Sequence, residues 1–440
     1  MINSEPIIKI AILQQSLEAS LNLEDAYRLA DDRPLFGSLT CRAEAGDITL
    51  EDASGQIFTR GRELFLTPAD PAKASFTLLN VRIGIQFHWE RVQTQSFRGG
   101  IILKMNADGT FCVLNLIGLE DYLASVISSE MSADAPLEFL QAQAVAARSW
   151  LVAMLEKKKA PRAKQHRSAD EIEVWQDVND HQGFDVCADD HCQRYQGVTR
   201  IISGNVARAI DATRGLFLTE VGRICDARYY KCCGGQTDVF STAWEDIRYP
   251  YLENISDHTH AHAPVASEKE AAAWLRSKPA AYCNTNDQEI LRRILPAFDL
   301  ETLNFYRWQI VYTREELEKI LKAKSGIDFG DLQQLIPLQR GPSGRIYKLK
   351  IIGTLKTVIV GKELEIRRWL SESHLLSSAF VVTVEHDADG AIRRFIFHGG
   401  GWGHGVGLCQ IGAAVMAVQG HGAEDILAHY FTGAILKKLY

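Results

Sequence analysis

The most informative stretch of the sequence is residues 119–149, which read LEDYLASVISSEMSADAPLEFLQAQAVAARS. Apolar residues in its first part recur at intervals of three and four, and the same helical face ends in Glu130. Asp134 and Pro136 then suit the N-cap and first turn of a second helix, which the basic run at Lys157 closes. We therefore expect two consecutive helices, with Glu130 in the last turn of the first.

Glu130 has the setting of a carboxyl group that holds its proton. Burial disfavours the carboxylate, and so does the negative end of the helix dipole, so both raise its pKa. A carboxylic acid that is protonated near neutral pH is the general acid of glycosidic-bond cleavage. The alternative is a glutamate that ends a helix and turns into water, and the sequence alone leaves both interpretations open.

Strand and helix patterns alternate in blocks on either side of this helix pair. Residues 7–115 are strand-like with turn residues between the runs, and 197–245 return to strands and loops. Residues 266–330 are helical in pattern and include a capping box from Thr313 to Glu316, whereas 345–398 are again strand-like. Residues 160–180 are polar and predict a surface excursion.

These blocks predict an α+β fold: a β-rich multi-domain protein with a two-helix catalytic segment and a cleft between β-rich parts. A family resemblance, carried by the motifs described below, implies four parts. They are a β-rich N-terminal domain (1–90), the first half of the catalytic region (91–250), an inserted helical or mixed subdomain (251–345), and the second half with a Gly-rich loop (346–440).

Composition limits the classes of function. The net charge of −7 argues against a general nucleic-acid binder, which would carry a basic field. No run approaches the roughly 18 apolar residues of a membrane span, and the first residues lack the pattern of a signal peptide, so the sequence reads as cytoplasmic. Nine scattered cysteines favour metal binding over a disulfide framework.

One cluster of cysteine and histidine has the composition of a zinc site. His181, Cys187, His191 and Cys192 lie within twelve residues and suit tetrahedral zinc. Four protein ligands would leave no open position, so the ion would be structural. The alternative is free thiols with surface histidines, because the spacing matches no common zinc-finger pattern.

A second segment, residues 229–237, has the residues of a sugar-binding surface. Tyr230 and Lys231 precede a Gly pair and then Gln236 and Thr237, with Trp244 further on. Aromatic faces stack on sugar rings, and glycine allows a ligand to approach the backbone. The adjacent cysteines in this segment are interpreted as structural, because no base is placed beside them.

The Gly-rich stretch 398–413 reads HGGGWGHGVGLCQIGA and predicts a loop where backbone meets a ligand or another backbone. Six glycines in the nine residues 399–407 exclude a helix or an ordinary strand there, and a helix is expected to begin near Leu408. The stretch lacks the Lys-Ser/Thr end of a phosphate loop. Trp402, His404 and Gln410 would supply a stacking face and polar contacts. A tight structural turn is the alternative.

Five separated blocks resemble the stage II sporulation protein D and amidase-enhancer family (SpoIID/LytB), in the family's order. The resemblance runs from about 90 to 260 and from about 345 to 440. The blocks are Phe97–Gly100, Leu119–Met131, Leu140–Ser149, Gly234–Thr237 with Trp244, and Gly401–Ala413.

The resemblance implies a lytic transglycosylase that cleaves peptide-free glycan strands of peptidoglycan at MurNAc and releases 1,6-anhydro products. Glu130 matches the family's catalytic acid, and the His181–Cys192 cluster matches a zinc site found in some relatives. Denuded strands carry lactyl carboxylates, so cations are expected in the cleft. The expected substrate-binding residues are Arg148, Tyr230, Lys231, Gln236, Thr237, Trp402, His404 and Gln410.

Two other functions remain open on the sequence. The first is a non-catalytic glycan binder that stimulates a peptidoglycan amidase, which would then be a second partner beside the glycan. The second is a zinc-dependent wall amidase. The segment from about 250 to 345 departs from the core of the family. The substrate implies a periplasmic or extracellular location, in contrast to the missing export signal.

Overall fold

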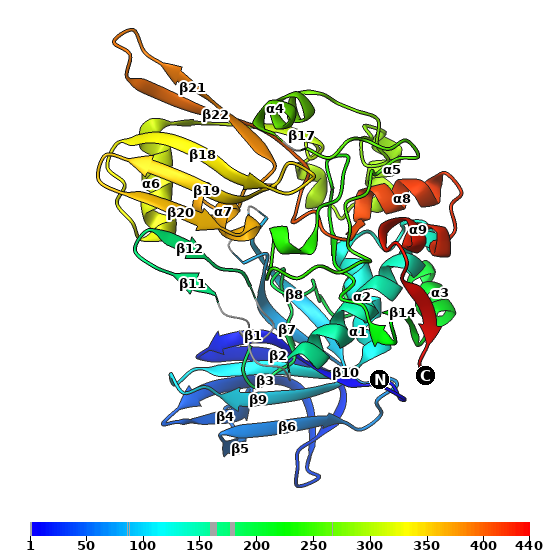
Figure 1. Ribbon diagram of the computed structural model, residues 1–440. Helices are drawn as coiled ribbons and strands as arrows, with labels where there is room; N and C mark the ends of the chain where they lie inside the picture. Colours follow the sequence, from blue (N-terminus) through cyan, green and yellow to red (C-terminus); the bar gives the residue numbers. More distant parts are fainter. Residues whose placement is uncertain (1, 86, 88, 159–164, 177–180, 266) are drawn as a thin grey trace.

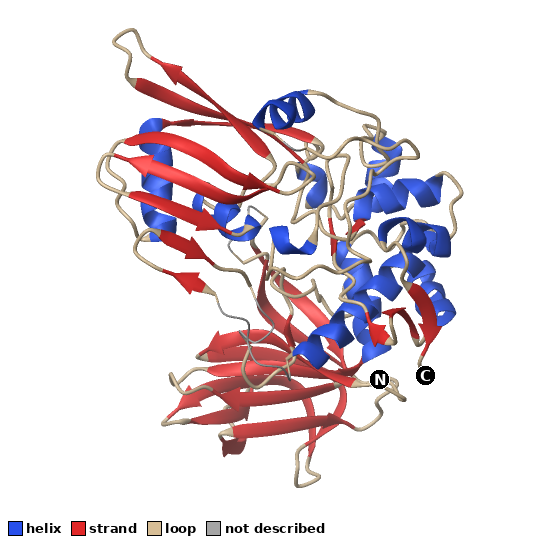
Figure 2. Ribbon diagram, in the orientation of Figure 1, coloured by secondary structure: helices blue, strands red, loops and turns tan. Residues whose placement is uncertain are grey.

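The computed structural model describes residues 2–85, 87, 89–158, 165–176, 181–265 and 267–440. It confirms the predicted α+β class: several β-sheets lie beside a group of helices at one side of the molecule (Figures 1 and 2). No helix within these residues has the length and apolar character required to cross a membrane.

The first half of the chain builds an 11-stranded sheet, at the bottom of Figure 1. Buried and exposed residues alternate along much of it, as expected for a sheet with one face against the core. The predicted boundary at residue 90 falls inside this sheet, because β8 pairs with β7 and β9 with β6. Its strands are β1 (Ile7–Ser16), β2 (Glu18–Arg28), β3 (Pro34–Glu44), β4 (Asp47–Asp52), β5 (Ile57–Gly61), β6 (Glu63–Pro68), β7 (Ser75–Ile83), β8 (Arg91–Arg98), β9 (Gly100–Met105), β10 (Phe111–Gly118) and β13 (Val186–Cys187).

Helices gather around α2 beside this sheet. The two predicted helices are α1 (Leu119–Glu130) and α2 (Leu137–Lys157); α2 begins one residue after Pro136, so the capping role expected of Asp134 is wrong. Around α2 pack α3 (Gly204–Thr213), α8 (Gln410–Val418) and α9 (Ala423–Tyr430). Helix α3 lies in a stretch expected to be strand and loop. Next to them, β14 (Leu216–Glu220) pairs with β15 (Arg223–Ile224) and β24 (Ile435–Lys438).

A second lobe is built on a five-stranded sheet, at the upper left of Figure 1. Helix α6 begins at the predicted capping box of Thr313 and Glu316. The described part of the excursion expected over 160–180 joins this sheet as β11 and β12; the rest lies outside the described residues. Helix α7 (Glu363–Trp369) packs against β19 and β20, and α6 (Arg314–Ser325) packs against α7. The sheet strands are β11 (His166–Arg167), β12 (Glu171–Glu173), β18 (Leu332–Arg340), β19 (Ile346–Gly353) and β20 (Thr357–Gly361).

The segment 251–345 is mixed. It contains α4 (Glu268–Arg276), α5 (Gln288–Ile294), the 3-10 turn η3 (Asp299–Glu301) and β17 (Arg307–Thr313), besides α6 and β18. Strand β17 pairs with β22 (Ile392–Gly400), which also pairs with β21 (Phe380–His386). The expectation that the Gly-rich stretch excludes a strand is therefore wrong for Gly399 and Gly400, which end β22.

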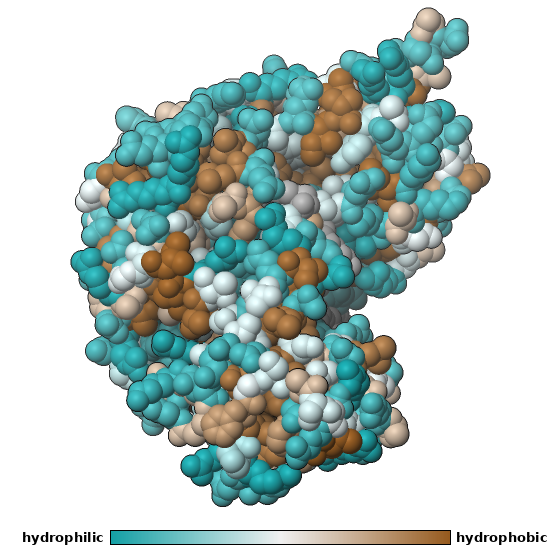
Figure 3. All heavy atoms as spheres, turned by 180° about the vertical axis from the view of Figure 1, so that it is seen from behind, coloured by the Kyte–Doolittle hydropathy of each residue, from teal (hydrophilic) through white to brown (hydrophobic). Residues whose placement is uncertain are grey.

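Two short strands bring distant segments together. β16 (Tyr229–Tyr230) pairs in parallel with β23 (Leu408–Cys409), so the segment 229–237 lies against the Gly-rich stretch. Seen from behind, the surface is mostly hydrophilic and is hollowed between the N-terminal sheet and the lobe of the five-stranded sheet (Figure 3). The four-part division of the chain stays a prediction, although the meeting of 229–237 with 398–413 brings two of the expected parts into one site.

Candidate functional site

Glu130 is the last residue of α1, as its sequence pattern predicts. The helix begins where the Glu5 carboxylate accepts a hydrogen bond from the Glu120 backbone N–H (3.0 Å). It ends where Lys231 Nζ donates to the Glu130 carbonyl oxygen (2.6 Å). An ammonium group at this end satisfies a carbonyl that has no partner within the helix and opposes the helix dipole.

The Glu130 side chain is 9% exposed, so it does not extend into water. Its Oε1 accepts hydrogen bonds from the Arg194 backbone N–H (3.1 Å) and, more weakly, from the Tyr229 hydroxyl (3.5 Å). Burial raises the pKa of Glu130 above its ordinary value, and Arg194 and Lys231 partly oppose that rise. The carboxyl group therefore keeps a proton at higher pH than an exposed glutamate does.

A buried charge network surrounds this acid. Asp299 Oδ2 accepts from Lys231 Nζ (2.7 Å) and lies 3.4 Å from Arg194 Nη1. Arg194 also pairs with Asp190 (2.7 Å) and lies over the Trp89 ring, 4.3 Å from its centre. Sequence reasoning missed Arg194 and Asp299. Arg194 lies two residues after the predicted metal ligand Cys192, which was an available signal, whereas Asp299 lies far along the chain in η3.

Six of the nine predicted catalytic and substrate-binding residues line one pocket, together with the predicted metal ligands His191 and Cys192. The six are Glu130, Tyr230, Lys231, Trp402, His404 and Gln410. Aromatic side chains form much of the remaining wall, and several cations reach it. The aromatic residues are Phe87, Trp89, Trp150, Tyr229 and Trp244; the further cations are Lys157, Arg194, Arg228 and Arg367.

Four polar atoms of the pocket residues are buried without a hydrogen-bond partner among the described residues. They are the Tyr230 hydroxyl oxygen, Gln410 Nε2, Asp190 Oδ2 and Arg228 Nε, and the last of these forms an ion pair with Asp226. A buried donor without a partner is costly, so such groups are common where a ligand completes them. The pocket combines stacking faces, cations, free hydrogen-bonding groups and one buried acid, as a site for a polar, ring-containing anion requires.

The Gly-rich loop lies directly against the segment 228–233. Gly405 and Gly407 have φ of 86° and 83°, and a Cβ at either would lie 2.5 Å or less from Arg345 or from the Arg228 carbonyl oxygen. The His404 Nε2–H donates to the Tyr229 carbonyl oxygen (3.0 Å), and its Nδ1 accepts from the Val406 N–H (3.1 Å). Burial lowers the pKa of His404, so the ring is neutral and serves first to fix this loop.

Three of the expected substrate-binding residues do not line the pocket. Arg148 is fully buried and makes a bidentate ion pair with Glu120 (3.0 and 2.6 Å). Gln236 and Thr237 are also buried; their side chains donate to the carbonyl oxygens of Ala263 and Glu253. The structure corrects these three assignments, because each polar group is already used inside the fold.

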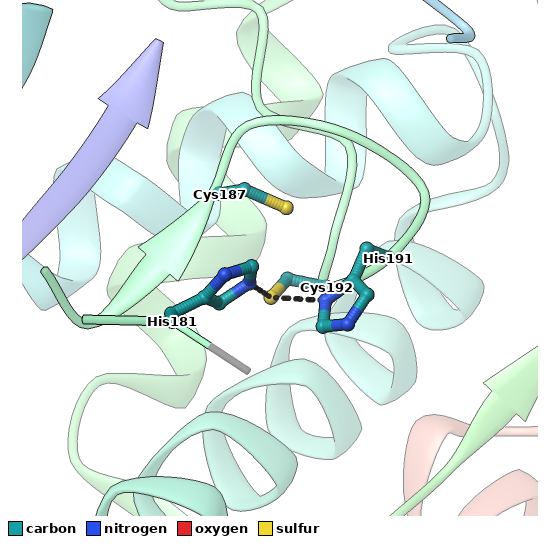
Figure 4. Close-up of side chains that lie close together, drawn as sticks. All are labelled: His181, Cys187, His191 and Cys192. Carbon is teal, nitrogen blue, oxygen red and sulfur yellow. Dashed lines mark hydrogen bonds between the residues drawn. The ribbon is translucent and has the colours of Figure 1, made fainter. Parts of the chain in front are cut away.

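The four predicted metal ligands converge. Figure 4 shows the side chains of His181, Cys187, His191 and Cys192 pointing into one space. Their ligand atoms lie within 4.8 Å of one another, and Cys192 Sγ is 3.2 Å from His181 Nε2 and 3.4 Å from His191 Nδ1. Two imidazole nitrogens and two thiols are a complete tetrahedral donor set for zinc, so these residues fit the ion. Zinc occupancy stays a prediction.

The chain that follows this cluster is attached to α1. Gln193 Oε1 accepts from the Tyr122 hydroxyl (2.9 Å), Arg194 N–H donates to Glu130, and the Gln196 N–H donates to Ser125 Oγ (3.1 Å). We call residues 193–196 the strap. An ion bound to the His181–Cys192 cluster would fix the start of the strap and hence the hydrogen bond on Glu130.

This arrangement is that of a pocket with the buried Glu130 carboxyl group in its wall and the Gly-rich loop along one side. Residues 107–219, which include α1, α2, the metal cluster and the strap, match the model of the stage II sporulation protein family (SpoIID), and residues 238–407 match a domain of unknown function, DUF8618. The chain contains a SpoIID family domain.

Individual relatives extend the likeness over most of the chain. It is 24% identical over 319 residues to stage II sporulation protein D of Bacillus amyloliquefaciens, covering 72% of this chain and 73% of the relative. It is 23% identical over 318 residues to the protein of the same name from Bacillus subtilis, covering 72% and 74%. An uncharacterised protein of Brachyspira hyodysenteriae is 25% identical over 334 residues, covering 76% and 70%.

Proposed function

We propose that this protein is a lytic transglycosylase that cleaves peptide-free peptidoglycan strands at MurNAc. The observation that carries the proposal is the buried Glu130 carboxyl group, whose pKa is raised and which lines a pocket of aromatic and cationic residues. The SpoIID family domain supports a role at the bacterial cell wall.

In the proposed reaction Glu130 acts twice. As general acid, it gives its proton to the glycosidic oxygen while the bond from MurNAc C1 to that oxygen breaks. As general base, it then takes the proton of the MurNAc C6 hydroxyl while O6 bonds to C1. The products are a 1,6-anhydro sugar and a new hydroxyl end, and no water is consumed. One carboxyl group performs both proton transfers, so no second carboxylate nucleophile is required.

The other two acids that line the pocket, unlike Glu130, form ion pairs with arginine side chains. Asp190 forms an ion pair with Arg194, and Glu363 lies 3.4 Å from Arg367. Each of these two carboxylates is therefore already occupied by a guanidinium group. The pocket therefore offers one carboxyl group suited to donate a proton, together with aromatic faces for sugar rings.

Cations at the pocket suit the lactyl carboxylates of a strand that has lost its stem peptides. Arg228 has its guanidinium carbon 4.0 Å from the centre of the Trp244 ring, and Lys231 lies 5.9 Å from that of Trp402. Each pair places a positive charge beside an aromatic face, and an acidic sugar requires both. Arg148, buried with Glu120, is not part of this proposal.

In this proposal zinc on the His181–Cys192 cluster has a structural role. Zinc in a catalytic site has three protein ligands and one open position, whereas four protein ligands converge here. The ion would stabilise the strap rather than activate water. This donor count is the reason that a zinc-dependent amidase is not the function we propose.

The experiment is to incubate the full chain with denuded glycan strands and to look for anhydro-MurNAc ends by mass spectrometry. Wild-type protein should form them, Glu130→Gln should not, and Asp121→Asn on the exposed side of the same helix should behave as wild type. Binding without product would support the amidase-enhancer function instead. Cleavage of the bond to a stem peptide, abolished by chelators, would support a zinc amidase.

A further inference from the structure

A second set of metal-binding side chains lies behind the Gly-rich loop, away from the His181–Cys192 cluster. It consists of Cys233, Asp257, Cys283 and Cys409, whose ligand atoms all lie within 4.8 Å of one another. All four are buried, with exposed fractions of 3% for Cys233 and 0% for the others. They come from four separate segments of the chain, so only the fold brings them together.

The distances in this cluster suit a shared ion better than a disulfide. Cys233 Sγ and Cys283 Sγ are 3.4 Å apart. Two sulfurs bound to one tetrahedral zinc at 2.3 Å are about 3.8 Å apart, whereas a disulfide requires about 2.05 Å. Two backbone N–H groups also point at sulfur: that of Cys233 at Cys409 Sγ (3.2 Å) and that of Gly235 at Cys233 Sγ (3.3 Å). Such donors stabilise thiolate ligands.

The charge of Asp257 gives an independent argument. Its Oδ2 accepts from the Cys283 backbone N–H (2.8 Å), and its Oδ1 accepts from the Tyr430 hydroxyl. No lysine, arginine or histidine among the described residues forms an ion pair with it, although the equally buried Asp299 has two such partners. A fully buried carboxylate requires a cation or a proton, and thiolates beside it increase that requirement.

We propose that Cys233, Cys283, Cys409 and Asp257 bind a second zinc ion in a structural, thiolate-rich site. Three thiolates and one carboxylate are a complete tetrahedral donor set. The nearby Cys232 thiol, which interacts with Cys283 and Cys409, is not a ligand in this proposal.

Such an ion would hold together the two walls of the pocket. Cys233 follows Lys231 by two residues, and Cys409 directly precedes the pocket residue Gln410. The Cys232 and Trp402 backbones exchange two hydrogen bonds (3.0 and 2.7 Å), which connects the cluster to the stacking face of Trp402. Cys283 and Asp257 belong to the segment 251–345, so the ion would also attach that segment to the two walls of the pocket.

The experiment measures metal in the full chain purified under reducing conditions without chelator. Elemental analysis should give two zinc ions per chain, and zinc-edge X-ray absorption should give on average about 2.5 sulfur neighbours per zinc, against 2 for the His181–Cys192 cluster alone. Cys283→Ser and Asp257→Asn should each remove or weaken one equivalent. His181→Ala should remove the other, so that the remaining ion has three sulfur neighbours.

Two controls accompany these variants. Cys41→Ala, a buried cysteine of β3 outside both clusters, and Cys232→Ser should keep two equivalents. The proposal is overturned by one zinc per chain that His181→Ala removes, by a Cys233–Cys283 disulfide in the purified protein, by an iron–sulfur absorption spectrum, or by loss of zinc in Cys232→Ser. If Cys283→Ser does not fold, the zinc content and the number of sulfur neighbours of the unmodified chain still test the proposal. Glycan cleavage is not the readout, so the result is independent of the proposed function.

Discussion

The backbone N–H of Arg194 donates a hydrogen bond to Oε1 of Glu130 at 3.1 Å. Arg194 lies two residues after the proposed metal ligand Cys192, and Glu130 ends a helix contributed by another part of the chain. Through this hydrogen bond, the backbone connects the proposed metal cluster to the buried acid.

Glu130→Gln should abolish the formation of anhydro ends while stabilising the fold at neutral pH. General acid catalysis contributes roughly 10²–10⁴-fold, and the amide cannot donate the proton. The raised pKa of Glu130 means that its contribution to stability is present below the unfolded pKa and is lost as pH rises through the folded pKa.

The variant carries no charge at this position, so its melting temperature should be higher than that of wild type at pH 7. The increase in melting temperature should be smaller at pH 4. Thermal melts at the two pH values, together with the product assay, test both parts. An equal change in melting temperature at both pH values would show that the carboxyl group is not perturbed by burial.

Loss of the metal ion proposed for the His181–Cys192 cluster should loosen the strap. In Cys187→Ser the anchor of the strap is lost, so amide hydrogen exchange should rise across residues 193–196, and activity should fall although Glu130 is unchanged. The matched control is Cys112→Ser, which alters a buried cysteine outside both clusters. Unchanged exchange across 193–196 would mean that the strap is held by its hydrogen bonds alone.

Lys231→Met should destabilise the protein by about 3–5 kcal/mol, because it leaves Asp299 as a buried charge without its closest partner. It should also move the activity profile to higher pH, since Lys231 lowers the pKa of Glu130. Urea denaturation and a pH–rate profile measure the two effects.

The double variant Lys231→Met/Asp299→Asn provides the control for this pair. It removes both charges, so it should recover part of the lost stability, whereas the cap on the Glu130 carbonyl should stay absent. Additive losses in the double variant would contradict the pairing of the two side chains.

Arg148→Met should destabilise the fold by about 3–5 kcal/mol without weakening glycan binding by the folded protein. Its guanidinium is fully buried against Glu120, which also accepts from the Tyr440 hydroxyl (2.6 Å). Binding to denuded strands, measured well below the melting temperature, should match wild type. Strongly weakened binding there would restore the role that the sequence suggested for Arg148.

Local patterns predicted the parts of the site that are close in sequence. The helical spacing that ends at Glu130 and the ligand spacing from His181 to Cys192 each lie within one short segment, so periodicity and donor chemistry were sufficient. The parallel pairing of β16 with β23 could not be predicted in this way, although both Gly-rich segments were identified as candidates.

The errors have a common physical cause, which is that a polar side chain is used by a distant partner. Nothing near Arg148 in the sequence indicates that Glu120 will neutralise it, and Gln236 and Thr237 bind carbonyl groups from the following segment. Conversely, Asp299 contributes to the site from a region outside the recognised core of the family. Burial of charge depends on tertiary contacts, which one sequence does not reveal.

The pairing of Tyr229–Tyr230 with Leu408–Cys409 also has a consequence for biosynthesis. Contacts between residues so far apart in sequence form late, because the closure of a long loop must precede them. A nascent chain that has emerged only as far as residue 400 already has Glu130 at the end of its helix but lacks the opposite wall with Trp402. The pocket therefore requires the segment that includes Trp402 and Gln410, and a chain that ends before it would have the buried acid without the opposite wall.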